Sequence, residues 1–134
     1  MAPLRLLLDT HVASWSVLTP QRIRSDVREV LIDPANEVWV SDVSLWEIAI
    51  KRGLIRKSAE GLPASVEYAR RAFVEAGFEA LPIKYDHIRA LERLPAGHGD
   101  PFDRLLIAQA LTEPMRLVTH DRQVAQYSDT VILV

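Results

Sequence analysis

The sequence predicts an α/β fold in which a parallel sheet is covered by helices on both faces, and three observations support this prediction. Short segments of strand length alternate along the chain with longer segments of helical length, which is the pattern of parallel sheets with crossover helices. Segment 4–8 is a largely apolar run, typical of a strand buried on both faces. No repeat, low-complexity tract or long linker divides the chain, so we expect one domain over residues 1–134.

The first half of the chain is predicted to contain two strands and four helices. The strands cover 4–8 and 37–40. One helix begins near residue 10, and the other three cover 20–32, 42–52 and 64–76. Pro34 stops the second helix, because the residue before a proline disfavours helical geometry. Ser41 caps the third helix. Gly53 and Gly77 end the third and fourth helices, as glycine commonly does at helix C-termini.

The second half is predicted to contain three strands and three helices. The strands cover 78–83, 116–119 and 130–134, and the helices cover 86–94, 101–112 and a few residues after 121. Pro95 ends the first of these helices, and Pro101 stands at the first position of the second, where its fixed φ favours helix formation.

Composition narrows the class of protein. The chain has no cysteine, which excludes disulfides and thiolate metal sites. No apolar run is long enough to cross a membrane, and the charge of Asp9 ends the N-terminal apolar run too early for a secretion signal. We therefore expect a cytoplasmic protein without a membrane partner. The net charge is −2, so a nucleic-acid partner must be held by a local basic patch.

Four carboxylates stand where a predicted strand has just ended or a predicted helix has just begun. They are Asp9, Glu47, Asp103 and Asp121. In an open α/β sheet these places share one edge, and ligands bind there, beyond the carboxyl ends of the strands. The sequence therefore predicts that the four side chains converge in one crevice.

Each acid also has a simpler interpretation, and the sequence alone leaves both open. Asp9 and Asp121 are suitable N-caps for the helices that follow them. Asp100 is a suitable N-cap before Pro101, with Asp103 placed to complement the helix dipole. Glu47 is four residues before a lysine and is spaced for a surface ion pair.

A divalent cation would offset the repulsion between several carboxylates in one crevice. Carboxylates a few ångströms apart repel each other, and some would stay protonated at neutral pH unless a cation lies between them. Mg²⁺ and Mn²⁺ prefer oxygen ligands. No histidine pair has the spacing of a zinc site. The sequence therefore predicts a hard-cation site.

Four segments together resemble the PIN-domain family, most closely the VapC toxins of bacterial toxin–antitoxin pairs. The segments are LLLDTH at 6–11, SDVSLWEIAIK at 41–51, GDPFDRLLIAQA at 99–110 and LVTHD at 117–121. The first segment alone is a weak signal, whereas the four in this order and spacing are highly specific. The resemblance spans almost the whole chain.

The resemblance implies a three-layer α/β/α sandwich around a parallel sheet of about five strands in the order 3-2-1-4-5. It also implies a Mg²⁺- or Mn²⁺-dependent endoribonuclease that acts as the toxin of a type II toxin–antitoxin pair. The implied partners are a second copy of the chain, in a homodimer, and a VapB-like antitoxin that occupies the active-site groove. The implied acidic set is Asp9, Glu47, Asp103 and Asp121, with Asp100 as a fifth acid that binds metal or only caps its helix.

Within that set, Asp9 and Asp103 are the expected direct ligands. Glu47 and Asp121 are expected to act through water or to orient the nucleophile. Hydroxyl groups are expected to support the acids, namely those of Thr10, Ser44 and Thr119.

Basic residues beside the acids are candidates for phosphate contacts, which position a nucleic acid without reading its sequence. They are Lys51, Arg52, Arg56 and Lys57, together with Arg104. The alternative for the first four is a solvated helix end that complements the helix dipole. The three tryptophans Trp15, Trp39 and Trp46 are expected to be core residues rather than base-stacking surfaces.

Two other functions fit parts of the pattern. A PIN scaffold without catalysis would bind RNA or a protein partner, although such scaffolds commonly lose an acid and this chain has all four. A phosphotransfer domain would also place an aspartate after the first strand, but the sequence Asp9-Thr10-His11 lacks the second acid such domains usually carry. The sequence does not specify which RNA is cleaved.

Overall fold

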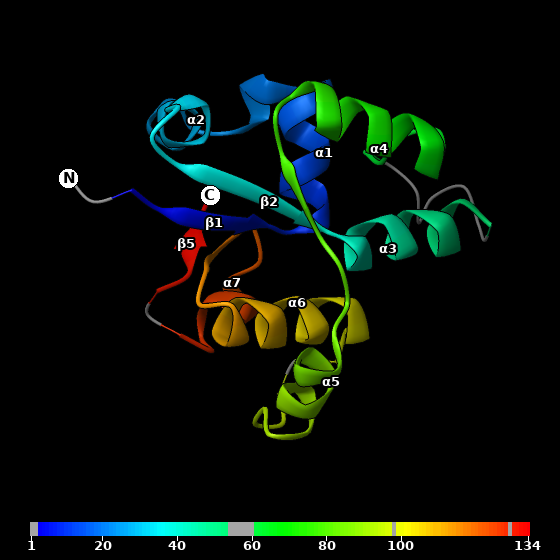
Figure 1. Ribbon diagram of the computed structural model, residues 1–134, viewed down its shortest axis with the longest axis vertical. Coiled ribbons are helices and arrows are strands. Elements are labelled where there is room, and N and C mark those ends of the chain that lie inside the picture. The colour runs from blue at the N-terminus through cyan, green and yellow to red at the C-terminus, as the bar shows by residue number, and fades with distance from the viewer. Residues whose placement is uncertain (1–2, 54–60, 98, 129) are drawn as a thin grey trace.

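A computed structural model describes residues 3–53, 61–97, 99–128 and 130–134. Its centre is a five-stranded sheet in the order β3-β2-β1-β4-β5, with every neighbouring pair parallel (Figure 1). The strands are β1 Arg5–Leu8, β2 Glu37–Ser41, β3 Glu79–Leu81, β4 Arg116–Thr119 and β5 Ile132–Leu133. The predicted fold class and strand order are confirmed.

Strand β1 lies in the middle of the sheet and is the point where the strand order reverses. Leu7 of β1 is paired with Trp39 of β2 on one side and with Leu117 of β4 on the other. The residues that follow β1 and β4 therefore emerge side by side. This is the place in a doubly wound sheet where a ligand crevice forms.

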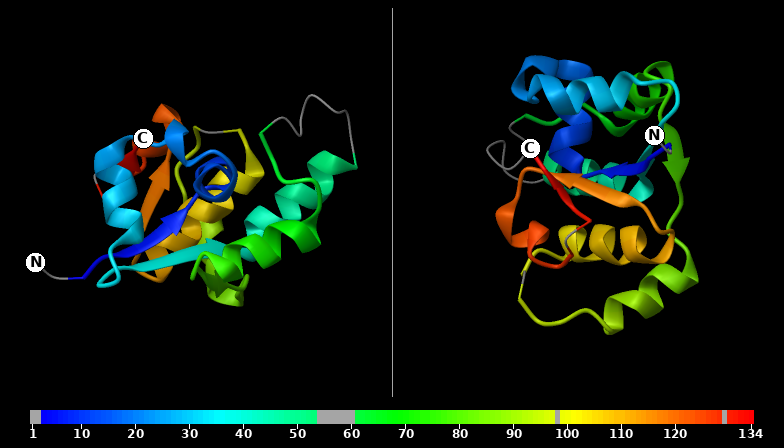
Figure 2. Two further views of the ribbon diagram at one scale, coloured as in Figure 1. Left: turned by 90° about the horizontal axis from the view of Figure 1, so that it is seen from above. Right: turned by 90° about the vertical axis from the view of Figure 1, so that its left-hand side faces the viewer.

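Helices cover both faces of the sheet (Figures 1 and 2). One layer contains α1 Thr10–Leu18, α2 Ser25–Ile32 and α4 Val66–Glu75, and the other contains α5 Tyr85–Glu92, α6 Pro101–Thr112 and α7 Arg122–Ala125. Side chains of β1 alternate between the layers, since Leu6 and Leu8 belong to the first core and Leu7 to the second. All three leucines are fully buried, which explains the apolar character of this strand.

Helix α3, Asp42–Arg52, extends from the carboxyl end of β2 and contacts both layers. It packs against α1 and α4 on one side and α6 on the other. Its side chain Ile48 enters the first core, whereas Val43 enters the second. This position brings one face of α3 over the crevice beyond β1 and β4.

Three predicted elements differ from those observed. The predicted helix 20–32 is divided into a 3-10 turn at Pro20–Arg22 and α2, because Ile23 takes an extended conformation that buries its side chain. The third strand is shorter than predicted, since Pro82 has no N–H to extend the ladder. The fifth strand pairs only with the last two residues of β4. No helix among the described residues is long and apolar enough to span a membrane.

Candidate active site

All five acids predicted from the sequence line one cavity at the carboxyl edge of the sheet. The cavity has a volume of about 180 Å³. Its lining residues are Asp9, Thr10, His11, Glu47, Lys51, Asp100, Asp103, His120 and Asp121. They come from the ends of β1 and β4, from the starts of α1 and α6, and from the second and third turns of α3, so the predicted convergence is confirmed.

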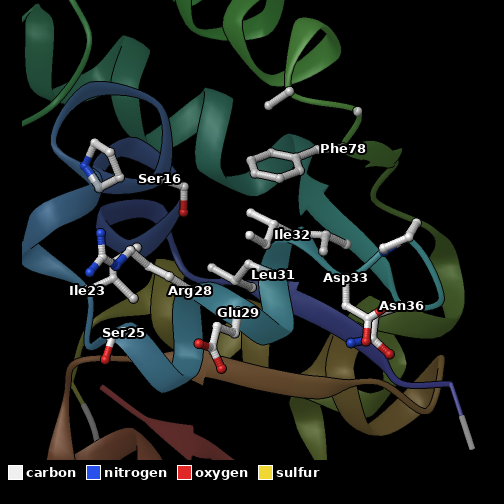
Figure 3. Close-up of a pocket in the computed structure, with 15 residues that line it drawn as sticks. Ser16, Ile23, Ser25, Arg28, Glu29, Leu31, Ile32, Asp33, Asn36 and Phe78 are labelled. Atoms are coloured by element: carbon white, nitrogen blue, oxygen red, sulfur yellow. The ribbon is translucent and has the colours of Figure 1, made fainter.

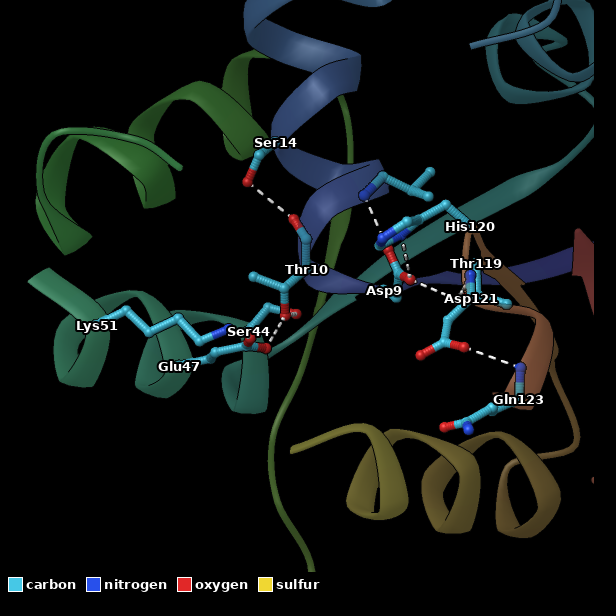
Figure 4. Close-up of polar contacts among 11 residues, drawn as sticks. Asp9, Thr10, Ser14, Ser44, Glu47, Lys51, Thr119, His120, Asp121 and Gln123 are labelled. Atoms are coloured by element: carbon cyan, nitrogen blue, oxygen red, sulfur yellow. Dashed lines mark hydrogen bonds and ion pairs between the residues drawn. The ribbon is translucent and has the colours of Figure 1, made fainter. Parts of the chain in front are cut away.

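Asp9 both caps a helix and faces the cavity. One carboxylate oxygen, Oδ1, accepts a hydrogen bond from the backbone N–H of Val12 at 2.8 Å, which caps α1. The other, Oδ2, accepts a hydrogen bond from the hydroxyl of Thr119 at 2.5 Å (Figure 4). The residue is 4% exposed. The predicted N-cap and the predicted place in the crevice are therefore both confirmed, because capping uses only one of the two carboxylate oxygens.

Glu47 is held in the cavity wall by one neighbour from its own helix and one from α1. The hydroxyl of Thr10 donates to Oε1 at 2.6 Å and also contacts Ser44 Oγ at 3.0 Å. The ammonium group of Lys51 lies 2.5 Å from Oε2 (Figure 4). The predicted pair with Lys51 forms, but Glu47 is 3% exposed, so this is a pair within the site and not a solvated one.

The other three acids begin helices at the rim of the cavity and are half-buried. Asp100 caps α6 by accepting a hydrogen bond from the N–H of Phe102 at 2.8 Å. Asp121 caps α7 by accepting one from the N–H of Gln123 at 2.8 Å. Both capping predictions are confirmed. Asp103 lies in the first turn of α6, where the helix dipole stabilises its charge.

Two of the three predicted hydroxyl supports bond directly to acids. Thr119 donates to Asp9, and its oxygen also accepts the backbone N–H of Asp121 at 3.1 Å. It therefore ties together the acids that follow β1 and β4. Thr10 holds Glu47, and Ser44 contacts Thr10. All three hydroxyl residues are buried, so the side chains of Asp9 and Glu47 are held by hydroxyl groups that are shielded from solvent.

Two histidines beside Asp9 have pKa values shifted in opposite directions. The Nδ1 atom of His120 lies 3.4 Å from Oδ2 of Asp9, and this contact raises the pKa of His120 above its ordinary value of 6.5. Burial lowers the pKa of His11 below 6.5, although the charge of Asp9 acts in the other direction. The sequence placed both histidines next to acids but gave no signal that they share one cavity.

The chemistry of this cavity fits a hard cation. Five carboxylates face one lysine there, and oxygen is the ligand atom that Mg²⁺ prefers. Within the described residues, no three acidic or histidine side chains are gathered tightly enough to ligate one ion by themselves. Mg²⁺ commonly binds through one or two carboxylates and keeps several waters. A cavity of 180 Å³ has room for such waters, each of which occupies about 30 Å³ in the liquid.

The predicted basic residues have different surroundings. Lys51 lines the cavity. Arg52 donates to the backbone carbonyls of Leu62 and Pro63, and Arg104 to the carbonyl of Pro95 at 3.0 Å, so part of each guanidinium is used to hold a loop. The predicted contacts of Arg56 and Lys57 lie outside the described residues.

The tryptophan prediction is wrong in part. Trp46 is 47% exposed and packs edge-on against Phe102 at 4.9 Å between ring centroids. Trp15 is half-buried, with the rings of His11 and His120 beside it. Trp15 and Trp39 pack against the two cores as predicted. The exposure of Trp46 depends on what neighbouring elements leave uncovered, which helical periodicity does not report.

A larger cavity of about 740 Å³ lies at the opposite edge of the sheet, between α2, the start of β2 and the end of α4 (Figure 3). It is lined by apolar side chains including Ile23, Leu31 and Phe78, and by the guanidinium of Arg28. Its lining acids are Glu29 and Asp33, against the five acids of the smaller cavity. We therefore place the candidate active site at the carboxyl edge.

The PIN domain family model matches residues 6–129. The chain belongs to the PIN domain family. A curated relative, Ribonuclease VapC22 of Mycobacterium tuberculosis, is 30% identical over 128 residues, and the match covers 91% of each chain. The resemblance inferred from the four sequence segments is thereby confirmed.

Solved structures support the same fold for this PIN domain. VapBC2 from Rickettsia felis, bound to a DNA fragment from its promoter, superimposes with a TM-score of 0.65 at 16% identity and covers 98% of each chain. FitAcB from Neisseria gonorrhoeae gives a TM-score of 0.64 at 15% identity, with 96% of each chain covered. VapBC-5 from Mycobacterium tuberculosis gives 0.61 at 19% identity, covering 98% of this chain and 100% of the other.

Proposed function

We propose that this PIN domain is a Mg²⁺- or Mn²⁺-dependent endoribonuclease and the toxin of a type II toxin–antitoxin pair. The observation that carries the proposal is the convergence of five acids on one cavity at the switch point of the sheet. Similarity to Ribonuclease VapC22 over nearly the whole chain supports the same reaction class.

Some residues of the cavity are proposed to bind the cation, and others keep the binding side chains in position. Asp9 and Asp103 face the cavity from different layers and are the proposed ligands. A bound cation would lower the pKa of a water and offset charge on the scissile phosphate. Thr119 fixes the carboxylate of Asp9 at 2.5 Å, so that acid keeps its orientation when substrate arrives.

Glu47 and Lys51 form an ion pair in the cavity, and we propose a separate role for each of them. The ammonium of Lys51 compensates the charge of Glu47 in the absence of other cations, and it lines the cavity where a phosphate would enter. Thr10 keeps Oε1 of Glu47 in place. We propose that Glu47 and Asp121 orient water around the reacting phosphate, as expected for acids one layer outside the direct ligands.

The test is cleavage of mixed RNA by the purified chain with Mg²⁺, with Mn²⁺ and with EDTA. Asp9→Asn and Asp103→Asn are expected to abolish cleavage while the fold stays intact. Asp26→Asn is the matched control, because Asp26 is a solvent-exposed acid in an ion pair with Arg24 outside the cavity. Full activity of either cavity variant, or activity in EDTA, would contradict the proposal, and an inactive but RNA-binding chain would favour the scaffold alternative.

We also propose that a VapB-like antitoxin binds this chain and that the toxin is a homodimer. The similar solved structures are VapBC and FitAcB assemblies, which supports such a partner. If a small antitoxin-like reading frame adjoins the gene, its co-expressed product should copurify with this chain in a complex that has no ribonuclease activity. Light scattering of the isolated chain tests the dimer, and a mass equal to one chain would contradict it.

A further inference from the structure

Beyond the cleavage chemistry, we propose that His11, Trp15, His120 and Arg22 form a subsite that stacks one RNA base beside the scissile phosphate. This ring cluster, named here by those four residues, is not needed to hold a cation. The inference rests on the proposed ribonuclease function and specifies how the substrate is held. The base is bound through its π-face, so the subsite takes any nucleobase of a single strand.

The rings of the ring cluster contact each other at the mouth of the acidic cavity. The centroids of His11 and His120 are 5.3 Å apart in an edge-to-face arrangement. The centroid of Trp15 is 5.1 Å from His120 and 6.0 Å from His11. Two of the three rings, those of His11 and His120, line the same cavity as the acids.

The outer parts of the ring cluster are open to solvent. The side chain of His120 is 42% exposed. The guanidinium of Arg22 lies over the indole of Trp15, 4.5 Å from its centroid, and Arg22 is an exposed residue. Arginine planes and aromatic rings are the groups on which proteins stack unpaired bases. The ring cluster therefore presents an imidazole and a guanidinium to a strand that enters the cavity.

The position of the ring cluster relative to the acids fixes which base it would hold. His120 Nδ1 is 3.4 Å from Oδ2 of Asp9, which we assign as a direct ligand. A phosphate bound at Asp9 has its neighbouring nucleoside within one nucleotide step of His120. The base next to the cleaved bond is therefore the one that reaches the ring cluster, while Lys51 lies on the opposite wall beside Glu47.

The test separates base contacts from phosphate contacts. The full chain carrying Asp103→Asn, which prevents cleavage, is titrated with short fluorescein-labelled oligoadenylate and with a ribose–phosphate chain of equal length that lacks bases. The parent is expected to prefer oligoadenylate by about fivefold or more, the lower end of the range for one base stacked on an aromatic ring. His120→Ala and Arg22→Ala should each reduce this preference severalfold, with little change in affinity for the abasic chain.

Two controls distinguish stacking from other roles. His120→Phe keeps a ring but cannot contact Asp9 through Nδ1, so it should retain the preference for bases. Arg24→Ala removes the same charge from a nearby exposed arginine, which pairs with Asp26 rather than a ring, and should leave the preference unchanged. Urea midpoints are measured for every variant to verify that the fold is unaltered.

The outcomes are separable from those of the cleavage assay. Equal affinity for the two chains, no detectable affinity for either, or equal loss in His120→Phe and His120→Ala would overturn the subsite even if the unsubstituted protein cleaves RNA with Mg²⁺. Failure of the unsubstituted protein to cleave any RNA would instead overturn the proposed function.

Discussion

Replacing Thr119 with valine is expected to destabilise the fold by about 2–4 kcal/mol. The hydroxyl of Thr119 donates to the buried carboxylate of Asp9 at 2.5 Å and accepts the N–H of Asp121 at 3.1 Å. A hydrogen bond to a charged group contributes roughly 1.5–3 kcal/mol and one between neutral groups roughly 0.5–1.5 kcal/mol. Valine has nearly the same shape, so it removes both bonds without leaving a cavity. Among the described residues, Asp9 Oδ2 then keeps its contact to His120.

The matched control is Thr119→Ser, which keeps the hydroxyl and loses one buried methyl group worth about 1 kcal/mol. Urea unfolding at neutral pH measures both variants, and a shift of the midpoint without a change in the slope identifies a change in stability. Valine should cost clearly more than serine. If serine costs as much as valine, packing rather than hydrogen bonding determines the contribution of Thr119, and the proposed anchoring of Asp9 is wrong.

Three further predictions follow from other parts of the structure. The Nε2 atom of His87 lies 2.6 Å from Oε2 of Glu113, and this hydrogen bond lowers the pKa of Glu113 below its ordinary value of 4.5. The stability that the bond adds is present above pH 4.5 and is lost as the pH falls through the folded pKa. Glu113→Gln should therefore flatten the decline of the urea midpoint in acid. Leu106→Ala in the second core should cost about 2–5 kcal/mol, whereas Leu111→Ala on the same helix, 51% exposed, should change the thermal midpoint little. Mg²⁺ at about 100 times its dissociation constant should stabilise the chain by about 2.7 kcal/mol, and EDTA or Asp103→Asn should remove that gain; an equal gain in Asp103→Asn would show that the ion binds elsewhere.

The sequence predicted those parts of the molecule that depend on short segments. The segment Asp100-Pro101-Phe102-Asp103 contains its own helix start, and the structure places the cap and both acids as expected. The alternation of strands and helices predicted the fold class, and the resemblance of the four segments to the PIN family predicted the strand order. These features depend on local chemistry or on motifs that recur.

Features that depend on packing between distant elements were not predictable. The break before α2 results from the burial of Ile23 between layers, which no neighbouring residue signals. Trp46 has the same local pattern as a core residue, yet 47% of it is exposed, and its ring packs edge-on against Phe102 of α6. The ring contacts of Trp15 join α1 to the end of β4, residues more than a hundred positions apart.

Helix capping and a place in the acidic cavity are compatible roles for one aspartate in this fold. The N-terminus of a helix stabilises negative charge, so an aspartate that begins a helix at the switch point enters the cavity at a reduced cost. Asp9 demonstrates the arrangement, since Oδ1 caps α1 and Oδ2 faces Thr119 and the cavity.

The two roles of Asp9 can be separated by substitution. Asparagine is as good an N-cap as aspartate, whereas alanine loses the cap, which costs about 1 kcal/mol. We therefore expect Asp9→Asn and Asp9→Ala to be equally inactive on RNA, with Asp9→Ala at least about 1 kcal/mol less stable in urea than Asp9→Asn, because alanine loses the cap and also the contact to Thr119. Equal stability of the two variants would show that the hydrogen bond to Val12 contributes nothing, and that Asp9 is kept at this position by the site alone.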